Sequence, residues 1–215
     1  MINLISKKYY IFDLDGTLID SNSLHEKAFL KTLEGESTEF RYSDFHGVKT
    51  FDVFKTLGFS DIRSEQMTIK KQETYRSYID DGIVESFRGV EELFSLLQEN
   101  SKSILLCTGA SRISVNKIIK LFSWDRFFFD TICGDEAKSS KPNPEILLTI
   151  MNRNSIKHDE VIYIEDSDKG LETGLRANVD TFIVHNKFKK AKRSFDEFFD
   201  FYDYVNESFK FKGVA

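Results

Sequence analysis

Short apolar runs alternate with segments of helical periodicity along most of this 215-residue chain. The runs are rich in aromatic and branched residues, as strands buried on both faces of a sheet are. They lie at residues 9–12, 104–107, 127–132, 161–164 and 181–184. Apolar residues at helical spacing mark the segments 91–97, 113–122 and 146–151. The alternation predicts an α/β fold, a doubly wound parallel sheet in which helices link successive strands.

Residues 18–85 interrupt this alternation. No convincing strand can be recognised there, and apolar residues such as Leu24, Ala28 and Leu33 follow one another at helical spacing. We therefore predict a core domain formed by residues 1–17 and 86–215. A small helical cap domain, residues 18–85, is inserted into it.

Charge, hydropathy and cysteine content exclude several classes of protein. The net charge is -5, which argues against nucleic acid as a partner, because such binding needs a basic surface. No apolar run approaches the ~18 residues of a membrane span, and no cleavage site of a signal peptide follows the first residues. Cys107 and Cys133 lack CxxC spacing and a neighbouring histidine cluster, so both are predicted to be buried thiols. We expect a monomeric cytoplasmic protein without a membrane partner.

The end of the chain is first basic and then acidic and aromatic. We predict that Lys187 to Arg193, within KFKKAKR, forms a solvated face. Phe195, Phe198 and Phe199 are predicted to pack in the core or between domains from a helix.

Two acids follow the first apolar run in the stretch YYIFDLDGT. Asp13 and Asp15 are two residues apart, so in extended geometry both side chains point to one side. Two carboxylates held together repel each other unless a cation lies beside them. The pair indicates a metal site, an acid/base pair or both, with a helix cap or turn as the structural alternative.

Polar residues also follow two other apolar runs. Thr108 and Gly109 come directly after ILLC, and Glu165 and Asp166 come directly after VIYI. The carboxyl ends of parallel strands line a single crevice, so these groups are expected to converge on one ligand. Acids together with a hydroxyl indicate phosphate with magnesium.

A lysine ahead of a rigid turn adds the missing positive charge. Lys141 lies in SSKPNPEILL, which contains both prolines of the chain. Asn143 is predicted to cap a helix that begins at Pro144, so the start of this helix is stiff and directs the ammonium group.

Four segments together resemble the motifs of the haloacid dehalogenase-like (HAD) hydrolase superfamily. They are DLDGT, the threonine after ILLC, the lysine of KPNP after GDEAKSS, and EDSDKGLETGLRAN, and they occur in the family's order over nearly the whole chain. The chain is most similar to the phosphatase branch with a small helical cap. The resemblance implies a Rossmann-like core and a Mg²⁺-dependent phosphatase acting on a small phosphorylated metabolite.

The resemblance also implies a role for each motif residue. Asp13 would attack phosphorus and form an aspartyl phosphate, while Asp15 would act as general acid and base with a pKa near the working pH. Mg²⁺ would be held by Asp13, the main-chain carbonyl of Asp15 and Asp166, with Glu165 in the outer sphere. The phosphate oxygens would be bound by Thr108, the Gly109 amide and Lys141. Gly170 and Gly174 are expected to allow close packing of a helix on the sheet.

Substrate choice is expected to depend on the inserted segment. His25 lies where related phosphatases and mutases often carry a histidine, and an ordinary exposed residue is the equal alternative. Lys71 lies in a cap helix where relatives often present a lysine to the substrate, although the favoured interpretation is a solvated side chain. Both are therefore candidates for substrate contact.

Two other functions stay open. A sugar phosphomutase resembling beta-phosphoglucomutase would use the same core residues, but Thr17 and Thr50 stand where those mutases usually have valine and arginine. A noncatalytic phospho-acceptor resembling receiver domains is the second alternative. The inserted cap and the position of Asp166 late in the chain argue against it.

Overall fold

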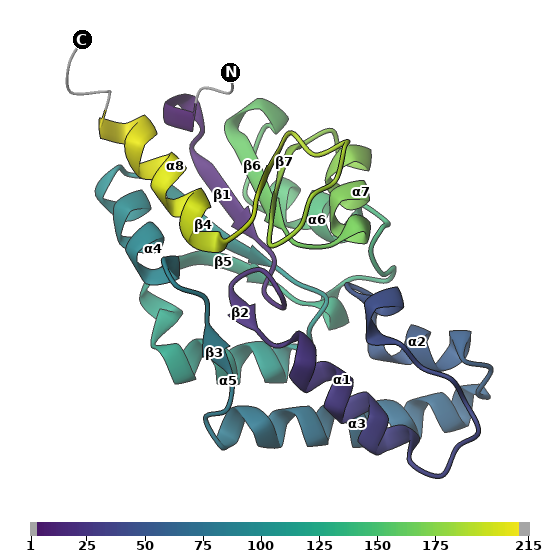
Figure 1. Cartoon of the computed structure of the whole chain (residues 1–215). Helices are drawn as coiled ribbons and strands as arrows, with labels where there is room; N and C mark the ends of the chain where they lie inside the picture. The colour runs from purple at the N-terminus through teal and green to yellow at the C-terminus, as the bar shows by residue number, and fades with distance from the viewer. Residues whose placement is uncertain (1–3, 211–215) are drawn as a thin grey trace.

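A parallel sheet forms the centre of this computed structural model, which describes residues 4–210 (Figure 1). Residues 1–3 and 211–215 of the predicted core domain lie outside the described part. Within it, the sheet has six strands in the order β5 (Phe128–Ile132), β4 (Ser103–Cys107), β1 (Tyr9–Phe12), β6 (Val161–Glu165), β7 (Asp180–Val184) and β8 (Arg193–Phe195). Every neighbouring pair is parallel. The predicted α/β fold with a doubly wound parallel sheet is confirmed.

Helices cover both faces of the sheet. The α-helices are α1 (Asn22–Leu33), α2 (Thr50–Thr56), α3 (Asp61–Asp80), α4 (Val90–Glu99), α5 (Arg112–Phe122), α6 (Glu145–Arg153), α7 (Asp168–Arg176) and α8 (Phe198–Lys210). Short 3-10 helices are η1 (Leu4–Ser6), η2 (Tyr42–Phe45), η3 (Trp124–Arg126), η4 (Gly134–Glu136) and η5 (His158–Glu160). Figure 1 shows α4 and α8 together on one side of the strands and α6 and α7 on the other. No α-helix within residues 4–210 is long and apolar enough to cross a membrane.

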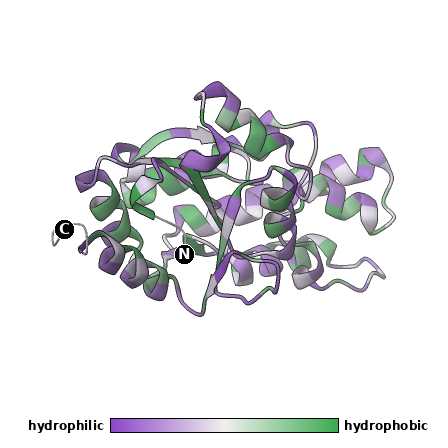
Figure 2. Cartoon of the chain, turned by 90° about the horizontal axis from the view of Figure 1, so that it is seen from above, coloured by the Kyte–Doolittle hydropathy of each residue, from purple (hydrophilic) through white to green (hydrophobic). Residues whose placement is uncertain are grey.

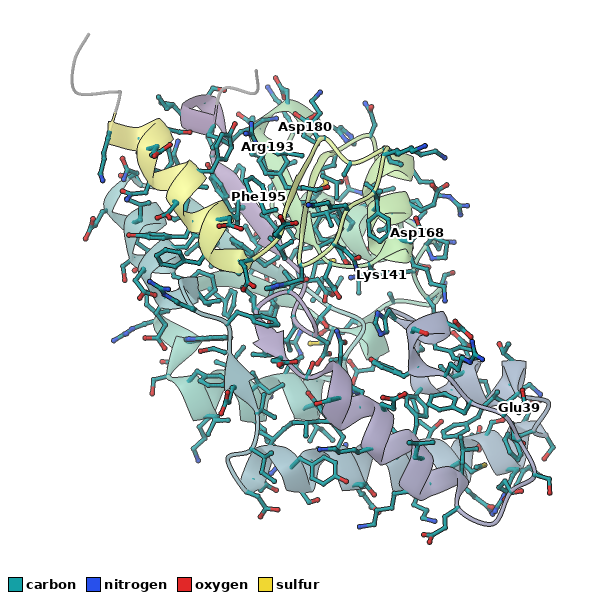
Figure 3. All side chains as sticks on the ribbon, in the orientation of Figure 1. Glu39, Lys141, Asp168, Asp180, Arg193 and Phe195 are labelled. Atoms are coloured by element: carbon teal, nitrogen blue, oxygen red, sulfur yellow. The ribbon has the colours of Figure 1, made fainter. Side chains whose placement is uncertain are left out.

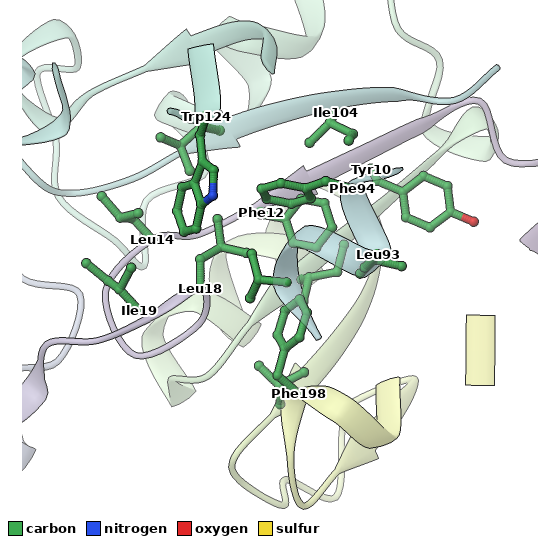
Figure 4. Close-up of a cluster of buried hydrophobic side chains, with 14 of the residues drawn as sticks. Tyr10, Phe12, Leu14, Leu18, Ile19, Leu93, Phe94, Ile104, Trp124 and Phe198 are labelled. Atoms are coloured by element: carbon green, nitrogen blue, oxygen red, sulfur yellow. The ribbon is translucent and has the colours of Figure 1, made fainter. Parts of the chain in front are cut away.

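The alternation of side chains along β1 divides the core into two clusters. Tyr10 and Phe12 belong to the cluster beneath α4, α5 and α8, whereas Ile11 belongs to the cluster beneath α6. Figure 4 shows aromatic rings at the centre of the first cluster, where the centroids of Phe12 and Phe94 are 5.6 Å apart in an edge-to-face arrangement. In Figure 2 the inner strands are largely hydrophobic, while the surrounding helices contain both hydrophilic (purple) and hydrophobic (green) residues.

Helices α1, α2 and α3 pack on one another beyond one edge of the sheet (Figure 1). They share a separate apolar cluster, whose buried members are Phe29, Leu33, Val53, Phe54 and Met67. A two-stranded antiparallel ribbon, β2 (Ile19–Asp20) with β3 (Glu85–Ser86), joins this helical part to the sheet. The expectation of no strand in residues 18–85 is therefore wrong at the two ends of that segment.

The end of the chain differs in part from prediction. Phe195 lies in β8 and not in a helix, because residues 193–195 pair with β7. Phe195 and Phe198 are buried as expected, while Phe199 is half-buried and its ring lies 3.8 Å from the guanidinium of Arg88. The lysines at 187, 189, 190 and 192 are exposed, which confirms the solvated face. Cys107 and Cys133 are buried and not paired with each other.

Candidate active site

The DxD acids lie at the carboxyl end of β1, in the centre of the sheet. Asp13 is 6% exposed, and its amide donates to Ile164 O on β6 at 2.9 Å. Gly16 then turns the chain with a φ of +79°. A Cβ added at Gly16 would lie 2.3 Å from Oδ2 of Asp166, so this turn leaves no room for a side chain.

Lys141 joins the acids of two neighbouring strands. Its Nζ donates to Asp13 Oδ1 at 2.6 Å and to Glu165 Oε1. Burial alone would lower the pKa of Lys141, but Asp13 and Glu165 outweigh it and raise the pKa above its ordinary value. The helix after this lysine, α6, begins one residue later than predicted, and its N-cap is Pro144 and not Asn143. The side chain of Asn143 still fixes the approach to the helix, because its Oδ1 accepts a hydrogen bond from the Glu145 amide at 2.9 Å. Figure 3 shows Lys141 between the sheet and the helices α1–α3.

Asp13, Glu165 and Asp166 form a cluster that fits a divalent cation. One carboxylate oxygen from each lies within 4.8 Å of the others. Glu165 also accepts hydrogen bonds from the hydroxyls of Tyr163 and Ser167, so its oxygens are largely occupied by hydrogen bonds within the protein. Burial, with the charges of Glu165 and Asp13, raises the pKa of Asp166 well above its usual range. Excess negative charge on buried hard oxygen ligands is what Mg²⁺ would neutralise.

The hydroxyl of Thr108 lies at the same edge, at the end of β4. Thr108 is 1% exposed, and its Oγ1 accepts a hydrogen bond from the Ala110 amide at 3.1 Å. Its proton therefore stays available for an oxyanion. Gly109 lies next to it and lines the same cavity. The residues predicted from the motifs are thus brought to a single edge of the sheet.

Asp15 differs from the sequence-based expectation. Its Oδ1 accepts hydrogen bonds from Ser21 Oγ at 2.6 Å, His25 Nε2 at 2.9 Å and Tyr75 OH at 3.1 Å. Burial alone would raise the pKa of Asp15, but His25, Ser21 and Lys71 outweigh it and hold the pKa below its usual range. The predicted pKa near the working pH is wrong for this state, because three donors surround one carboxylate oxygen.

The two cap candidates lie inside the molecule and not in solvent. His25 is 8% exposed on α1, and Lys71 is 2% exposed on α3. Nδ1 of His25 is in hydrogen-bond contact with Nζ of Lys71, while Nε2 contacts Asp15. The favoured interpretation of Lys71 as a solvated lysine is therefore wrong. Its burial results from the packing of α1 on α3, which is a tertiary contact.

A cavity of about 230 Å³ lies between the sheet edge and the helical part. The motif residues Asp13, Asp15, Thr108, Gly109, Glu165 and Asp166 line it from the core. His25 and Lys71 line it from the cap. A small ligand in this cavity would touch both parts of the chain.

Several polar residues at the site were not predicted. Thr17 Oγ1 donates to Asp166 Oδ1 at 3.2 Å, and Tyr163 and Ser167 support Glu165. Ser21 and Tyr75 bind Asp15 from the helical part. Only Tyr75 carries a local signal, because it follows Lys71 by four residues and so lies on the same face of α3.

Comparison with known proteins identifies the family. A family model described as haloacid dehalogenase-like hydrolase matches residues 10–184. The chain belongs to this family. Pyrophosphatase PpaX of Halalkalibacterium halodurans is 32% identical over 178 residues, which are 81% of this chain and 81% of that protein. The phosphorylated carbohydrates phosphatase of Thermotoga maritima is 24% identical over 183 residues, covering 82% of this chain and 85% of that protein.

A solved structure shows the same fold. Beta-phosphoglucomutase of Clostridium difficile matches with a TM-score of 0.84 and 22% identity, covering 97% of this chain and 100% of that one. The predicted family is therefore confirmed, and so is the prediction that this chain is an enzyme of the HAD-like hydrolases. The names of the two curated relatives support phosphatase activity.

Proposed function

We propose that this HAD-like hydrolase is a Mg²⁺-dependent phosphatase that acts on a small phosphorylated metabolite through an aspartyl phosphate on Asp13. The observation that carries the proposal is the meeting of Asp13, Lys141, Thr108 and Asp166 at one sheet edge, beside a cavity. Relatives named pyrophosphatase and phosphorylated carbohydrates phosphatase support it.

Asp13 is the nucleophile in this proposal. Its carboxylate attacks phosphorus while the leaving oxygen departs on the opposite side, which divides hydrolysis into two displacements. Lys141 and Thr108 bind the nonbridging oxygens, where negative charge must be neutralised in the transition state. The Gly109 amide is the third proposed phosphate ligand.

Mg²⁺ would be held by Asp13, the main-chain carbonyl of Asp15 and Asp166. Glu165 would stay in the outer sphere, where its carboxylate accepts hydrogen bonds from Lys141 and Ser167. When bound, the ion neutralises charge between a carboxylate and a phosphate, which otherwise repel each other. Burial, with the charges of Glu165 and Asp15, raises the pKa of Asp13 to about 8 against the opposing effect of Lys141. Positive charge near Asp13 is therefore needed to keep the nucleophile ionised at neutral pH.

Asp15 is the proposed general acid and base. The three hydrogen-bond donors around it favour the ionised form, which is the form that takes a proton from the attacking water in the second displacement. In the first displacement Asp15 must be protonated to give a proton to a leaving alkoxide. The hydrogen bonds from these donors must therefore be weaker while the substrate is bound.

Turnover of p-nitrophenyl phosphate tests the proposal. Wild-type protein should release phosphate with Mg²⁺ and not with EDTA, and Asp13→Asn should lose turnover. Asp159→Asn is the matched control, because Asp159 is an exposed acid in η5, at the amino end of β6 and therefore at the opposite end of this strand from the site. Mass spectrometry of rapidly acid-quenched protein should find the phosphoryl group on Asp13. Unchanged turnover in Asp13→Asn would refute the nucleophile.

The mutase alternative needs its own assay, because the fold is shared with beta-phosphoglucomutase. Thr50 lines the cavity at the start of α2, where a mutase would need a cation for its second phosphate. Any reaction of a hexose 1-phosphate should therefore release phosphate. Conversion to the 6-phosphate without release would identify a mutase instead.

A further inference from the structure

The charges that line the cavity are divided between its two walls. All the carboxylates that line it belong to the core side: Asp13, Asp15, Asp135, Glu165 and Asp166. Among the described residues that line it from the helical segment, the ionisable side chains other than tyrosine are His25, His46, Lys49 and Lys71. The chain as a whole has 35 acidic and 30 Lys and Arg residues, so a cap wall with bases and no acid is a local feature.

Lys71 is a buried ammonium group without a carboxylate partner. Within residues 4–210 its Nζ forms no salt bridge, and its polar contact is the ring nitrogen of His25. The rings of Phe29 and Tyr75 lie 4.6 and 5.0 Å from Nζ. A buried cation is costly unless an anion is close to it. The structure thus leaves a position for a negative charge from outside the chain.

Lys49 places a second ammonium group on the same wall. Its Nζ donates to the main-chain oxygen of Ala137, and no salt bridge involves it within the described residues. On nearby helices, the exposed Lys55 and the half-buried Lys117 each bind a carboxylate. Within residues 4–210, both lysines that line the cavity from the cap wall therefore lack a carboxylate partner.

We propose, on the basis of the phosphatase function above, that the substrate carries a second anionic group on its leaving side, which Lys71 and Lys49 bind. The reacting phosphoryl group lies at Asp13 and Lys141, and the second group faces the cap. The volume of about 230 Å³ is below the roughly 300–1,000 Å³ of sites for drug-sized ligands, so the compound is small. Inorganic pyrophosphate and phosphorylated short carboxylic acids have this chemistry, whereas phosphate esters of neutral sugars or glycerol do not.

The charge on Lys71 also gives the site a means of rejecting neutral leaving groups. An ester with a neutral alcohol would leave Lys71 buried and still without a counterion. A site built around a buried polar group discriminates strongly against analogues that lack the matching group. Burial, opposed only by Asp15, lowers the pKa of Lys71 to about 7, and a bound anion would favour its charged form.

The test measures both turnover and binding with three probes: inorganic pyrophosphate, 2-phosphoglycolate and glycerol 1-phosphate. Wild type should have a higher kcat/KM for at least one of the two doubly anionic probes than for glycerol 1-phosphate. Lys71→Met and Lys49→Met should each lower that preferred kcat/KM by about tenfold to a hundredfold. Lys49→Met should change the kcat/KM for glycerol 1-phosphate far less. Lys71→Met should lower it as well, but by a smaller factor, because Lys71 also acts on Asp15. Lys71→Arg should retain part of the preference. Lys70→Met and Lys55→Met are the controls, because Lys70 is exposed on the helix of Lys71 and Lys55 is exposed on α2, the helix that Lys49 precedes.

Comparing pyrophosphate with 2-phosphoglycolate distinguishes a second phosphate from a carboxylate. Equal losses for all three probes in Lys71→Met and Lys49→Met, or equal wild-type preference for glycerol 1-phosphate, would overturn the inference. Calorimetric binding of the same probes to Asp13→Asn keeps the two proposals separate. Selective binding of the doubly anionic probes that depends on Lys71 supports the inference even if no turnover is found, and absence of turnover then counts only against the phosphatase function.

Discussion

Replacement of Lys71 by methionine should stabilise the folded protein. Methionine has a similar length and no charge, and the site is buried against Phe29 and Tyr75. Burial lowers the pKa of Lys71 from its ordinary value of 10.5 to about 7 in the folded state. The folded protein therefore binds fewer protons at this lysine than the unfolded chain does between these two pH values.

The size of the effect follows from that difference. One pKa unit corresponds to about 1.4 kcal/mol, so at pH 7 the lysine destabilises the fold by up to about 4 kcal/mol relative to a neutral side chain. The two aromatic contacts and the hydrogen bond to His25 offset part of this cost, since a desolvated cation–π contact stabilises by about 2 kcal/mol. We expect Lys71→Met to raise the free energy of unfolding by about 1–3 kcal/mol at pH 7.

The pH dependence is the sharper measurement. Because the unfolded chain binds more protons here, the stability of wild type should rise relative to the variant as pH increases from 7 towards 10.5. The difference between the two proteins should therefore shrink by about 1.4 kcal/mol for each pH unit. Urea denaturation of both proteins at pH 7 and at about pH 9 gives this difference.

The exposed neighbour Lys70 gives the control, because Lys70→Met lies on the same helix without the burial. Its effect should be small at both pH values. A Lys71→Met protein that is less stable than wild type at pH 7, or a difference that does not change with pH, would refute the reasoning. The buried ammonium would then have a counterion or solvent access that the structure does not contain.

Three further predictions concern the cation site. Asp166→Asn should be more stable than wild type in EDTA, because it removes a buried like charge, and it should lose the rise in Tm that wild type shows with MgCl₂; an equal rise in both proteins would contradict the assignment. Gly16→Ala should lose turnover and about 1–3 kcal/mol of stability in urea denaturation, since its Cβ would meet Asp166 and the positive φ is strained; full activity would contradict this close contact. Thr17→Val should weaken Mg²⁺ binding in calorimetry by roughly 0.5–1.5 kcal/mol, because Asp166 loses a donor; an unchanged affinity would show that this hydroxyl does not orient the ligand.

The parts of the fold that sequence could predict are those with local signals. The buried strands are recognisable as apolar runs in the sequence. Polar residues directly after β1, β4 and β6 indicate the edge of the sheet at which these polar side chains meet. Strand β8 has no such signal, because Arg193, Ser194 and Phe195 become a strand only through pairing with β7. The division into domains at residues 17 and 86 stays a prediction, although β2 and β3 join the two parts near these positions.

The burial and protonation of individual side chains were harder to predict, since they depend on contacts between segments that are distant in the sequence. The sequence KKQETY around Lys71 is polar, so periodicity favours a solvated lysine, and only the packing of α1 on α3 buries it. Asp15 is a similar case. One of the three hydrogen-bond donors to its carboxylate is Tyr75, which is 60 residues away in the sequence.

The separate apolar cluster of the helical part bears on how substrate choice can vary in such a molecule. Phe29 and Phe54 pack with neighbours from α1, α2 and α3 and not with the sheet, so changes on the cap wall need not disturb Asp13, Lys141 or Asp166. In the proposed function, the core keeps its acids around a cation and a phosphoryl group whatever the substrate is. A base such as Lys71 can therefore match the charge of one leaving group while the chemistry at the sheet edge stays the same. In our proposal, the cap wall of this chain recognises the charge of the leaving group.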